Sequence, residues 1–310
     1  TVVWWVNIRF EKRFSPDFCQ LMKAAGCIAV SGGLEVASDR LLEKMKKGVT
    51  VAQVARVAAA FTEAGIMVHA YLMYGFPTQT VQETVDSLEM VRQMFQTGVL
   101  KSGFWHLFAM TAHSPVGLDP AAYGVRRIGP DFGGFADNDL AHEDPEGADH
   151  ERFSEGLRVS LFNYMQGAGL DLPLSKWFDF KIPRTTVPLD YIEKCLLENP
   201  TNSLRGTAQV VWLGYTPELH ILPEKKTQPQ MARLVFTDPF QAWALETDPH
   251  IARWLQEILP ELHIRQSNPV TVEALSARFE AAGLSDQRSF EAFTNSYTFQ
   301  ELCKNGLLIV

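Results

Sequence analysis

The 310-residue sequence lacks the features that mark several broad classes of protein. It has no apolar run near the roughly 20 residues that cross a membrane as a helix. It also has no basic start followed by a small-residue cleavage site. Acidic residues outnumber basic ones by 36 to 28, so the positive charge that binds nucleic-acid phosphates is missing. The sequence therefore predicts no transmembrane helix, no signal peptide, and neither a membrane nor a nucleic acid as partner.

Cysteine is also scarce. The four cysteines, Cys19, Cys27, Cys195 and Cys303, are widely spaced and include no Cys-x-x-Cys pair. This argues against a disulfide scaffold and predicts buried free thiols in a reducing compartment, with a single disulfide left open. We therefore expect a cytoplasmic protein. The absence of G-x-S-x-G, of G-x-x-x-x-G-K-[ST] and of the three-glycine dinucleotide fingerprint argues against three common enzyme classes.

What the first 115 residues do contain is an alternation of apolar strands and amphipathic helices. Strands are predicted over 2–10, 27–31, 66–74 and 103–111. Helices are predicted to begin after the capping residues Ser15, Ser38, Thr50 and Thr80. Such βαβ units predict an α/β fold with a parallel sheet. The strands are apolar almost throughout, which predicts cover on both faces. The pattern leaves open a doubly wound sheet or part of a barrel.

The rest of the chain changes character. Residues 116–155 are rich in glycine, proline and aspartate, and we expect a loop or linker there. Its acidic stretch, from Asp137 to Glu151, carries side chains that could bind a metal. The spacing matches neither H-E-x-x-H nor an EF-hand, so we interpret the stretch as solvated. Residues 156–310 mix helical and strand patterns and are predicted to form an α+β accessory domain.

Polar residues and glycines gather where the first two predicted strands end. The carboxyl ends of parallel strands are where α/β proteins bind ligands. Alternation places Asn7 and Arg9 on one side of the first strand, where they could bind a polar ligand. After the second strand, Gly33 permits close backbone approach, and Glu35 could accept hydrogen bonds from a ribose hydroxyl or an amino group. Taken alone, each feature is also consistent with an ordinary structural role.

The third and fourth strands end in further candidates. Met73 and Phe76, on either side of Gly75, could hold an adenine by apolar contact and stacking, together with Tyr71. His113 follows the fourth strand and could act as an acid, a base or a ligand. A core strand with its turn would explain the first group equally well, and a hydrogen-bonded structural histidine would explain the second.

The order of these pieces is more specific than any one of them. The run GGLEVASDRLLEKMKKGVT is followed by a helix, by GIMVHAYLMYGFPTQTVQET and by a strand that ends in HSP. This order resembles the second half of a radical S-adenosylmethionine (SAM) enzyme, most closely the branch that often follows a cobalamin-binding domain. The resemblance covers residues 1–115, and no motif extends it to residues 116–310.

The resemblance implies a partial (β/α)6 TIM-like barrel in which these are the third to sixth strands. It implies SAM as cofactor and a [4Fe–4S] cluster whose Cys-x-x-x-Cys-x-x-Cys ligands would lie upstream of Thr1. Cobalamin is an option if an upstream domain binds it. The implied activity is that of an oxidoreductase that cleaves SAM reductively to a 5′-deoxyadenosyl radical. Hydrogen abstraction or methyl transfer would follow on an unknown small-molecule substrate, with a reductant as partner.

The resemblance also implies roles for individual residues. By family position, cofactor contacts fall on Arg9, Gly33, Glu35, Met73, Gly75 and Phe76. Arg9 would bind the polar end of SAM and Glu35 its ribose or amino group. The turn after Met73 would lie near the adenine. Asn7 and His113 are further candidate contacts to substrate or SAM.

The sequence departs from the family pattern in three places. It contains no cysteine triplet with cluster spacing, Val36 and Ala37 replace the usual Ser-Gly, and Gln79 stands where Glu is common.

Two other functions stay open. One is a catalytically inert binding or scaffold domain on a half-barrel, and the other is an ordinary α/β lyase or isomerase with Glu35 as its carboxylate base. A four-stranded partial sheet would also expose two edges, through which two copies could pair as a dimer.

Overall fold

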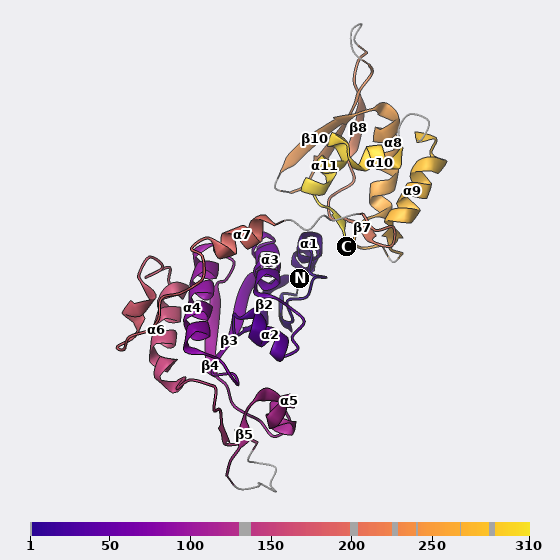
Figure 1. Ribbon diagram of the computed structural model, residues 1–310. Helices are drawn as coiled ribbons and strands as arrows, with labels where there is room; N and C mark the ends of the chain where they lie inside the picture. Colours follow the sequence, from indigo (N-terminus) through magenta and orange to yellow (C-terminus); the bar gives the residue numbers. More distant parts are fainter. Residues whose placement is uncertain are drawn as a thin grey trace. The chain divides into compact units, whose positions relative to one another are not determined.

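The computed structural model describes residues 2–129, 138–198, 204–224, 229–239, 241–266, 268–284 and 289–310. Contacts along the chain divide it into two compact units, residues 1–200 and 201–310, whose elements are labelled in Figure 1. The sequence placed the division near residue 156. Among the described residues, no helix combines the length and the apolar character that crossing a membrane requires.

The first unit is built on a four-stranded parallel sheet. The strands β1 (Trp4–Ile8), β2 (Cys27–Glu35), β3 (Met67–Tyr74) and β4 (Ser102–Leu107) pair in the order β1-β2-β3-β4. This confirms the predicted α/β class and is consistent with part of a TIM-like barrel. In the described residues the sheet does not close on itself, so β1 and β4 form its two edges.

The four helices that link these strands begin where the sequence predicts. They are α1 (Pro16–Ala24), α2 (Asp39–Lys44), α3 (Val51–Glu63) and α4 (Val81–Gln96). Ser15, Ser38, Thr50 and Thr80 each accept a hydrogen bond from the N–H group three residues later, which is the N-cap geometry. Thr80 and Glu83 form the reciprocal capping box. Local side-chain chemistry therefore determines where these helices start.

One face of the sheet carries the core of this unit. Val30, Val68, Leu72 and Trp105 are buried on that face, where α1 contacts β2 and α3 contacts β3. The helix α6 (Ser154–Met165) also contacts β4 and α4, and α7 (Tyr191–Leu197) contacts α3 and α4. Because both later helices pack on this core, residues 156–200 belong with the first unit rather than with the C-terminal domain.

The described part of 116–155 is more ordered than the expected loop. It contains α5 (Pro115–Leu118), two 3-10 helices (Pro120–Tyr123 and Glu151–Phe153) and the paired short strands β5 (Arg126–Arg127) and β6 (His142–Glu143). Its apolar side chains share a small buried cluster with Phe76 and Met110. The glycines and prolines therefore interrupt regular structure without preventing this segment from packing.

The second unit mixes helices with two antiparallel sheets, the α+β type that the sequence predicts. One sheet has the order β10-β9-β8, with β8 (Glu218–Ile221), β9 (Ala232–Thr237) and β10 (Ala242–Thr247). The other has the order β11-β7-β12, with β7 (Gln209–Trp212), β11 (Val270–Thr271) and β12 (Leu307–Ile309). The helices are α8 (Pro249–Glu261), α9 (Val272–Ala281), α10 (Phe290–Thr294) and α11 (Tyr297–Lys304).

Candidate functional site

The second face of the parallel sheet is uncovered in the described residues, contrary to the prediction that both faces are buried. Trp5, Met67 and Phe104 are 63%, 54% and 56% exposed there. We call this surface the open face. Alternation along the strands assigns to it Trp5, Asn7, Ser31, Gly33, Met67, His69, Tyr71, Met73, Ser102, Phe104 and His106. In the part of the chain that the structure describes, this face is a broad surface of the sheet on which a ligand could lie.

Strand register arranges the open face in rows. One row is polar across all four strands, because Asn7 pairs with Ser31, Ser31 with His69, and His69 with Ser102. The next joins Gly33 to Tyr71 and Phe104, and Met73 pairs with His106 beyond it. Two of the predicted site residues, Gly33 and Met73, therefore lie on this face, together with Asn7.

Glu35 ends β2 in a conformation that turns its side chain back over the sheet. Its φ is +58°, in the left-handed region, and the pairing of β2 with β3 shifts register between Gly33 and Glu35. A Cβ atom on Gly33 would lie 2.2 Å from Oε1 of Glu35. The carboxylate therefore occupies space that only a glycine at 33 leaves open.

Lys47 joins two of the predicted residues that are far apart in sequence. Its Nζ lies 2.7 Å from Oε1 of Glu35, and its backbone carbonyl accepts a hydrogen bond from Nη2 of Arg9. The side chains of Glu35 and Lys47 are 15% and 38% exposed, so both remain accessible to a ligand. A carboxylate, an ammonium and a guanidinium in one chain of contacts can recognise a ligand that carries both charged and hydroxyl groups. The lysine-rich run after α2 was the sequence feature that could have identified Lys47.

The turn after β3 is closed instead. Gly75 has a φ of +79°, and Oε1 of Gln79 accepts hydrogen bonds from the N–H groups of Gly75 (2.7 Å) and Phe76 (3.1 Å). Nε2 of Gln79 donates to Thr84 Oγ1 at 3.0 Å. Gln79 is fully buried, which suits a neutral amide with both donors and acceptors satisfied. The departure from Glu therefore has a structural role here.

Phe76 does not face the open side of the sheet. It is 4% exposed and meets the rings of Phe108 and Tyr123 edge-on, at centroid distances of 5.3 and 6.1 Å. These contacts belong to the cluster formed with the segment after β4. Stacking of an adenine on this ring would require that cluster to open.

Part of the acidic stretch covers the same turn, so the interpretation of that stretch as solvated is wrong at two residues. Asp144 Oδ2 accepts a hydrogen bond from the N–H of Thr78 at 2.7 Å. Nε2 of His150 lies 3.0 Å from the carbonyl oxygen of Gln79. Burial lowers the pKa of His150, against the opposing effects of that hydrogen bond and of nearby carboxylates. Asp137 lies outside the described residues.

The sequence did not identify His69, Tyr71 and His106 as a group of neighbouring rings on the open face. Nδ1 of His69 lies 2.8 Å from Ser102 Oγ, and the His69 and Tyr71 rings meet edge-on at 5.2 Å. Tyr71 is 6.5 Å from His106, whose ring is 4.5 Å from that of Phe104. Burial, followed by the nearness of His106, lowers the pKa of His69. The alternation in HAYLM and FWH was the available sequence feature, but it did not distinguish the open face from the core.

One predicted residue, His113, remains to be placed. His113 is exposed in the turn before α5, well beyond the end of β4 at Leu107, so it is not part of the sheet. Asn7 is exposed on the edge strand β1. Arg9 and Glu35 therefore meet through Lys47, whereas Gly75 and Phe76 belong to a separate, buried turn.

The cysteines do not form a metal site. None of the four cysteines forms a disulfide, and burial raises the pKa of the Cys19 thiol to about 12. Burial also raises the pKa of Cys27 and Cys195, and a protonated thiol is a poor metal ligand. In the part of the chain that the structure describes, no three His, Cys, Asp or Glu side chains are placed to hold a metal ion. The residues present therefore do not fit an iron–sulfur cluster.

Comparison with protein families identifies the strand–helix core. The model of the radical SAM superfamily matches residues 8–91, which run from the end of β1 into α4 and include Arg9, Glu35 and Gly75. This part of the chain is similar to the radical SAM superfamily. A search of curated proteins finds no match. The radical SAM segment thus contains the whole Arg9–Lys47–Glu35 chain of contacts.

Similar solved structures include two of TsrM from Kitasatospora setae, a radical SAM methyltransferase. One has cobalamin and a [4Fe–4S] cluster bound, and the other has its tryptophan substrate and the SAM analog aza-SAM bound. Both are 18% identical to this chain, with a TM-score of 0.38, over 52% of its length. The match covers 36% and 35% of those chains, so this chain spans about a third of the length of the TsrM structures. A likeness of this size does not assign a ligand.

Proposed function

We propose that this chain supplies the SAM-facing and substrate-facing surface of a cytoplasmic radical SAM iron–sulfur enzyme. The observation that carries the proposal is the meeting of Arg9, Lys47 and Glu35 at the ends of β1 and β2, inside the segment that matches the family. Such polar groups at the carboxyl edge of a parallel sheet are where α/β proteins bind ligands.

The geometry suggests how these residues would share the cofactor. Glu35 would accept hydrogen bonds from the ribose hydroxyls or the amino group of SAM, and Arg9 would bind its carboxylate. The absence of a side chain at Gly33 leaves room for the Glu35 carboxylate to lie over the sheet, where it would face the nucleoside. Met73 would give an apolar contact for the adenine. The N–H groups of Gly75 and Phe76 already bond to Gln79, so that turn would support the site rather than bind SAM.

The iron–sulfur cluster must come from residues that this chain does not contain. We propose that a Cys-x-x-x-Cys-x-x-Cys loop elsewhere in the full-length protein holds it, and that a reductant supplies its electrons. When bound, such a cluster supplies the electron that cleaves SAM. This chain's own residues would orient SAM and a small-molecule substrate on the open face, where His69, Tyr71 and His106 would position the substrate. Hydrogen abstraction and cobalamin-dependent methyl transfer are both compatible with that surface.

The ion pair between Lys47 and Glu35 argues against the lyase alternative. A general base must be free to take up a proton from its substrate. The Glu35 carboxylate instead lies 2.7 Å from an ammonium group. One carboxylate oxygen is thus already engaged by a cation, which suits a residue that binds a polar ligand.

The test uses the full-length protein, reconstituted anaerobically with iron and sulfide. We expect a brown protein that converts SAM to 5′-deoxyadenosine in the presence of dithionite. Glu35→Gln should raise the KM for SAM about tenfold, the loss of one charge-assisted contact. Glu43→Gln, an exposed residue on α2, is the matched control and should leave KM unchanged. A colourless protein that leaves SAM intact would favour the scaffold or lyase alternatives, and equal KM values for the two variants would remove Glu35 from the site.

A further inference from the structure

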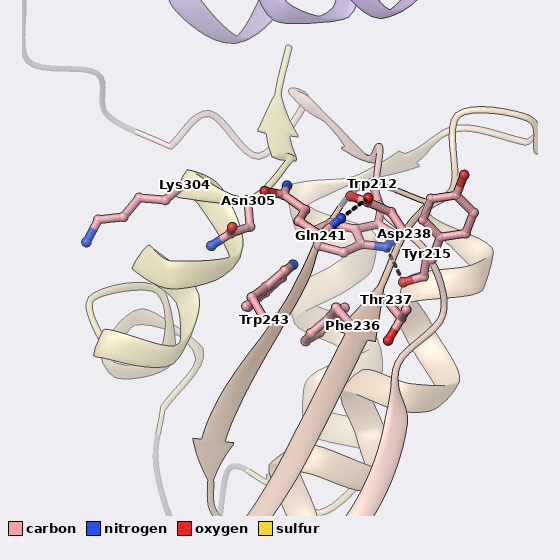
Figure 2. A pocket seen from close by; sticks show the side chains of 10 residues that line it. Trp212, Tyr215, Phe236, Thr237, Asp238, Gln241, Trp243, Lys304 and Asn305 are labelled. Atoms are coloured by element: carbon pink, nitrogen blue, oxygen red, sulfur yellow. Dashed lines mark hydrogen bonds between the residues drawn. The ribbon is translucent and has the colours of Figure 1, made fainter.

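The second unit contains a cavity that the proposed SAM chemistry does not use. Its volume is about 220 Å³. It lies where the end of β7, the β9–β10 hairpin and the C-terminal end of α11 meet, and Figure 2 shows the side chains that line it. Three segments that are far apart in sequence therefore build one concave surface, as ligand sites commonly do.

Three rings form one side of this cavity, and we call Trp212, Phe236 and Trp243 the aromatic wall. Phe236 and Trp243 pair across β9 and β10, and their rings stack in parallel with centroids 4.0 Å apart and 4° between the planes. The rings of Trp212 and Phe236 are 5.6 Å apart, inclined at 61°. Trp212 and Phe236 are buried, whereas Trp243 is half-buried. One indole of the wall is thus accessible from the cavity.

The aromatic wall is held in place before any ligand arrives. Trp212 Nε1 donates to the carbonyl oxygen of Tyr215 at 3.2 Å. A Cβ atom on Gly214 would lie 2.3 Å from Trp212 Cζ2, so the backbone there packs directly on the indole. A preformed surface loses little freedom on binding, which favours affinity for a small ligand.

The rim of the cavity offers both hydrogen-bond donors and acceptors. The hairpin is closed by hydrogen bonds from the N–H of Asp238 to the carbonyl of Gln241 (2.9 Å) and from the N–H of Gln241 to Asp238 Oδ1 (2.8 Å). The side chains of Gln241 and of Asn305, at the end of α11, each contribute an amide group. Figure 2 shows Gln241, Asn305 and Trp243 along the same cavity. The polar groups therefore surround the accessible indole rather than forming one charged patch.

The charges at the rim favour a neutral ligand. An anion would meet Asp238 and the negative end of the α11 dipole, while Lys304, the cation at the rim, lies 2.7 Å from Glu301. A cation would meet Lys304. It would also find no cage of free aromatic faces, because Phe236 and Trp243 stack on each other. The rim therefore complements neither an anionic nor a cationic ligand.

We propose that this cavity binds a neutral, hydroxylated ring with the chemistry of a pyranose sugar. Such a ring has an apolar C–H face that can pack on the Trp243 indole, and hydroxyl groups that both donate to and accept from the amides of Gln241 and Asn305. The cavity volume corresponds to about seven water molecules at about 30 Å³ each, which suits a single substituted ring. The site is independent of SAM and of the proposed radical chemistry.

The proposal is tested by ligand-observed saturation-transfer NMR on the whole chain. The probes are methyl glucopyranoside, methyl galactopyranoside and methyl N-acetylglucosaminide, with adenosine, benzoate and choline as competing chemistries. We expect saturation of the ring C–H protons of at least one glycoside, with a Kd of about 1–10 mM. Trp243→Leu should weaken this binding about tenfold or more.

A second variant distinguishes a loss of glycoside binding from a loss of folding. Gln241 is exposed, so Gln241→Ala should keep the fold and weaken glycoside binding about fivefold. Gln300→Ala, an exposed glutamine on α11 outside the cavity, should leave binding unchanged. Preferential saturation of adenosine, benzoate or choline would overturn the proposal. So would an absence of glycoside binding at about 20 mM, or equal effects of the two glutamine variants.

Discussion

The turns that follow β2 and β3 look alike in sequence but are built for different purposes. Both place a residue with positive φ, Glu35 or Gly75, at the carboxyl edge of the parallel sheet. At the first turn, the carboxylate lies back over Gly33 and pairs with a partly exposed lysine. At the second, the N–H groups of Gly75, Phe76 and Thr78 and the carbonyl of Gln79 are all hydrogen-bonded within the fold, and the segment after β4 covers the turn.

The difference shows that proximity to a strand end does not make a residue a ligand contact. A group can bind a ligand only if its hydrogen-bonding capacity is not already used inside the fold. The Glu35 side chain is 15% exposed, whereas the N–H groups of Gly75 and Phe76 already donate to Gln79. We therefore expect the β3 turn to respond to mutation through stability, and the β2 turn to respond through binding.

The largest stability effect is expected at Gln79. Gln79→Ala removes three hydrogen bonds and leaves the N–H groups of Gly75 and Phe76 without their acceptor in a buried turn. The free energy of unfolding should fall by about 3 kcal/mol, since each unsatisfied buried group costs about 1–3 kcal/mol. Urea unfolding followed by circular dichroism would measure it.

Two further variants define that result. Gln79→Glu keeps oxygens for the two N–H groups but loses the donor to Thr84, so it should destabilise the protein less than Gln79→Ala. Gln20→Ala, on the exposed side of α1, should change stability by less than about 0.5 kcal/mol. If Gln79→Ala were as mild as Gln20→Ala, the β3 turn would not be the rigid element described above.

A smaller decrease in the free energy of unfolding is expected at acidic pH, again because of a residue at the β3 turn. Burial lowers the pKa of His150 below its ordinary value of 6.5. The unfolded chain therefore binds a proton more readily than the folded one, and stability decreases as pH falls below 6.5. The slope from one such group is at most about 1.4 kcal/mol per pH unit. His69, whose pKa burial also lowers, adds to it from the open face.

The contribution of His150 can be isolated by substitution. His150→Gln removes the titrating group, so the decline in stability between pH 6.5 and pH 5 should become shallower. Gln20→Ala changes an exposed residue of the same unit that does not titrate, and it should leave the shape of the curve as it is. If the unfolding curves of wild type and His150→Gln coincided at each pH, protonation of His150 would make no contribution to the free energy of unfolding.

The fold of the first unit was largely predictable because local chemistry specifies it. Ser15, Ser38, Thr50 and Thr80 mark helix starts by a hydrogen bond to a nearby N–H group, and such short-range geometry is visible in sequence. The domain boundary was not predictable in this way. The packing of α6 and α7 on α3 and α4 depends on contacts between distant segments, which no local pattern encodes.

The site was predictable in part for the same reason. Arg9, Gly33 and Glu35 follow from strand ends and from the family motif, whereas Lys47 needed the three-dimensional path of the chain after α2. The open face was missed because an apolar strand such as MVHAYLMY predicts burial on both sides, and its histidine and tyrosine do not reveal which side lacks a covering layer. The binding of adenine by Phe76 remains a prediction whose cost is the opening of a buried cluster.

The smallest stability effect is expected at Glu35, and it is the most decisive for the comparison of the two turns. Glu35→Gln removes one ion pair whose partner, Lys47, is 38% exposed, and partly exposed pairs contribute about 0–1 kcal/mol. Urea unfolding should therefore show a loss of less than about 1 kcal/mol, well below that of Gln79→Ala. The same variant is expected to raise the KM for SAM about tenfold, so its effects on stability and on binding should separate. A loss of stability as large as that of Gln79→Ala, with KM unchanged, would mean that Glu35 only stabilises its turn. Both strand ends would then have a structural role and no role in binding SAM.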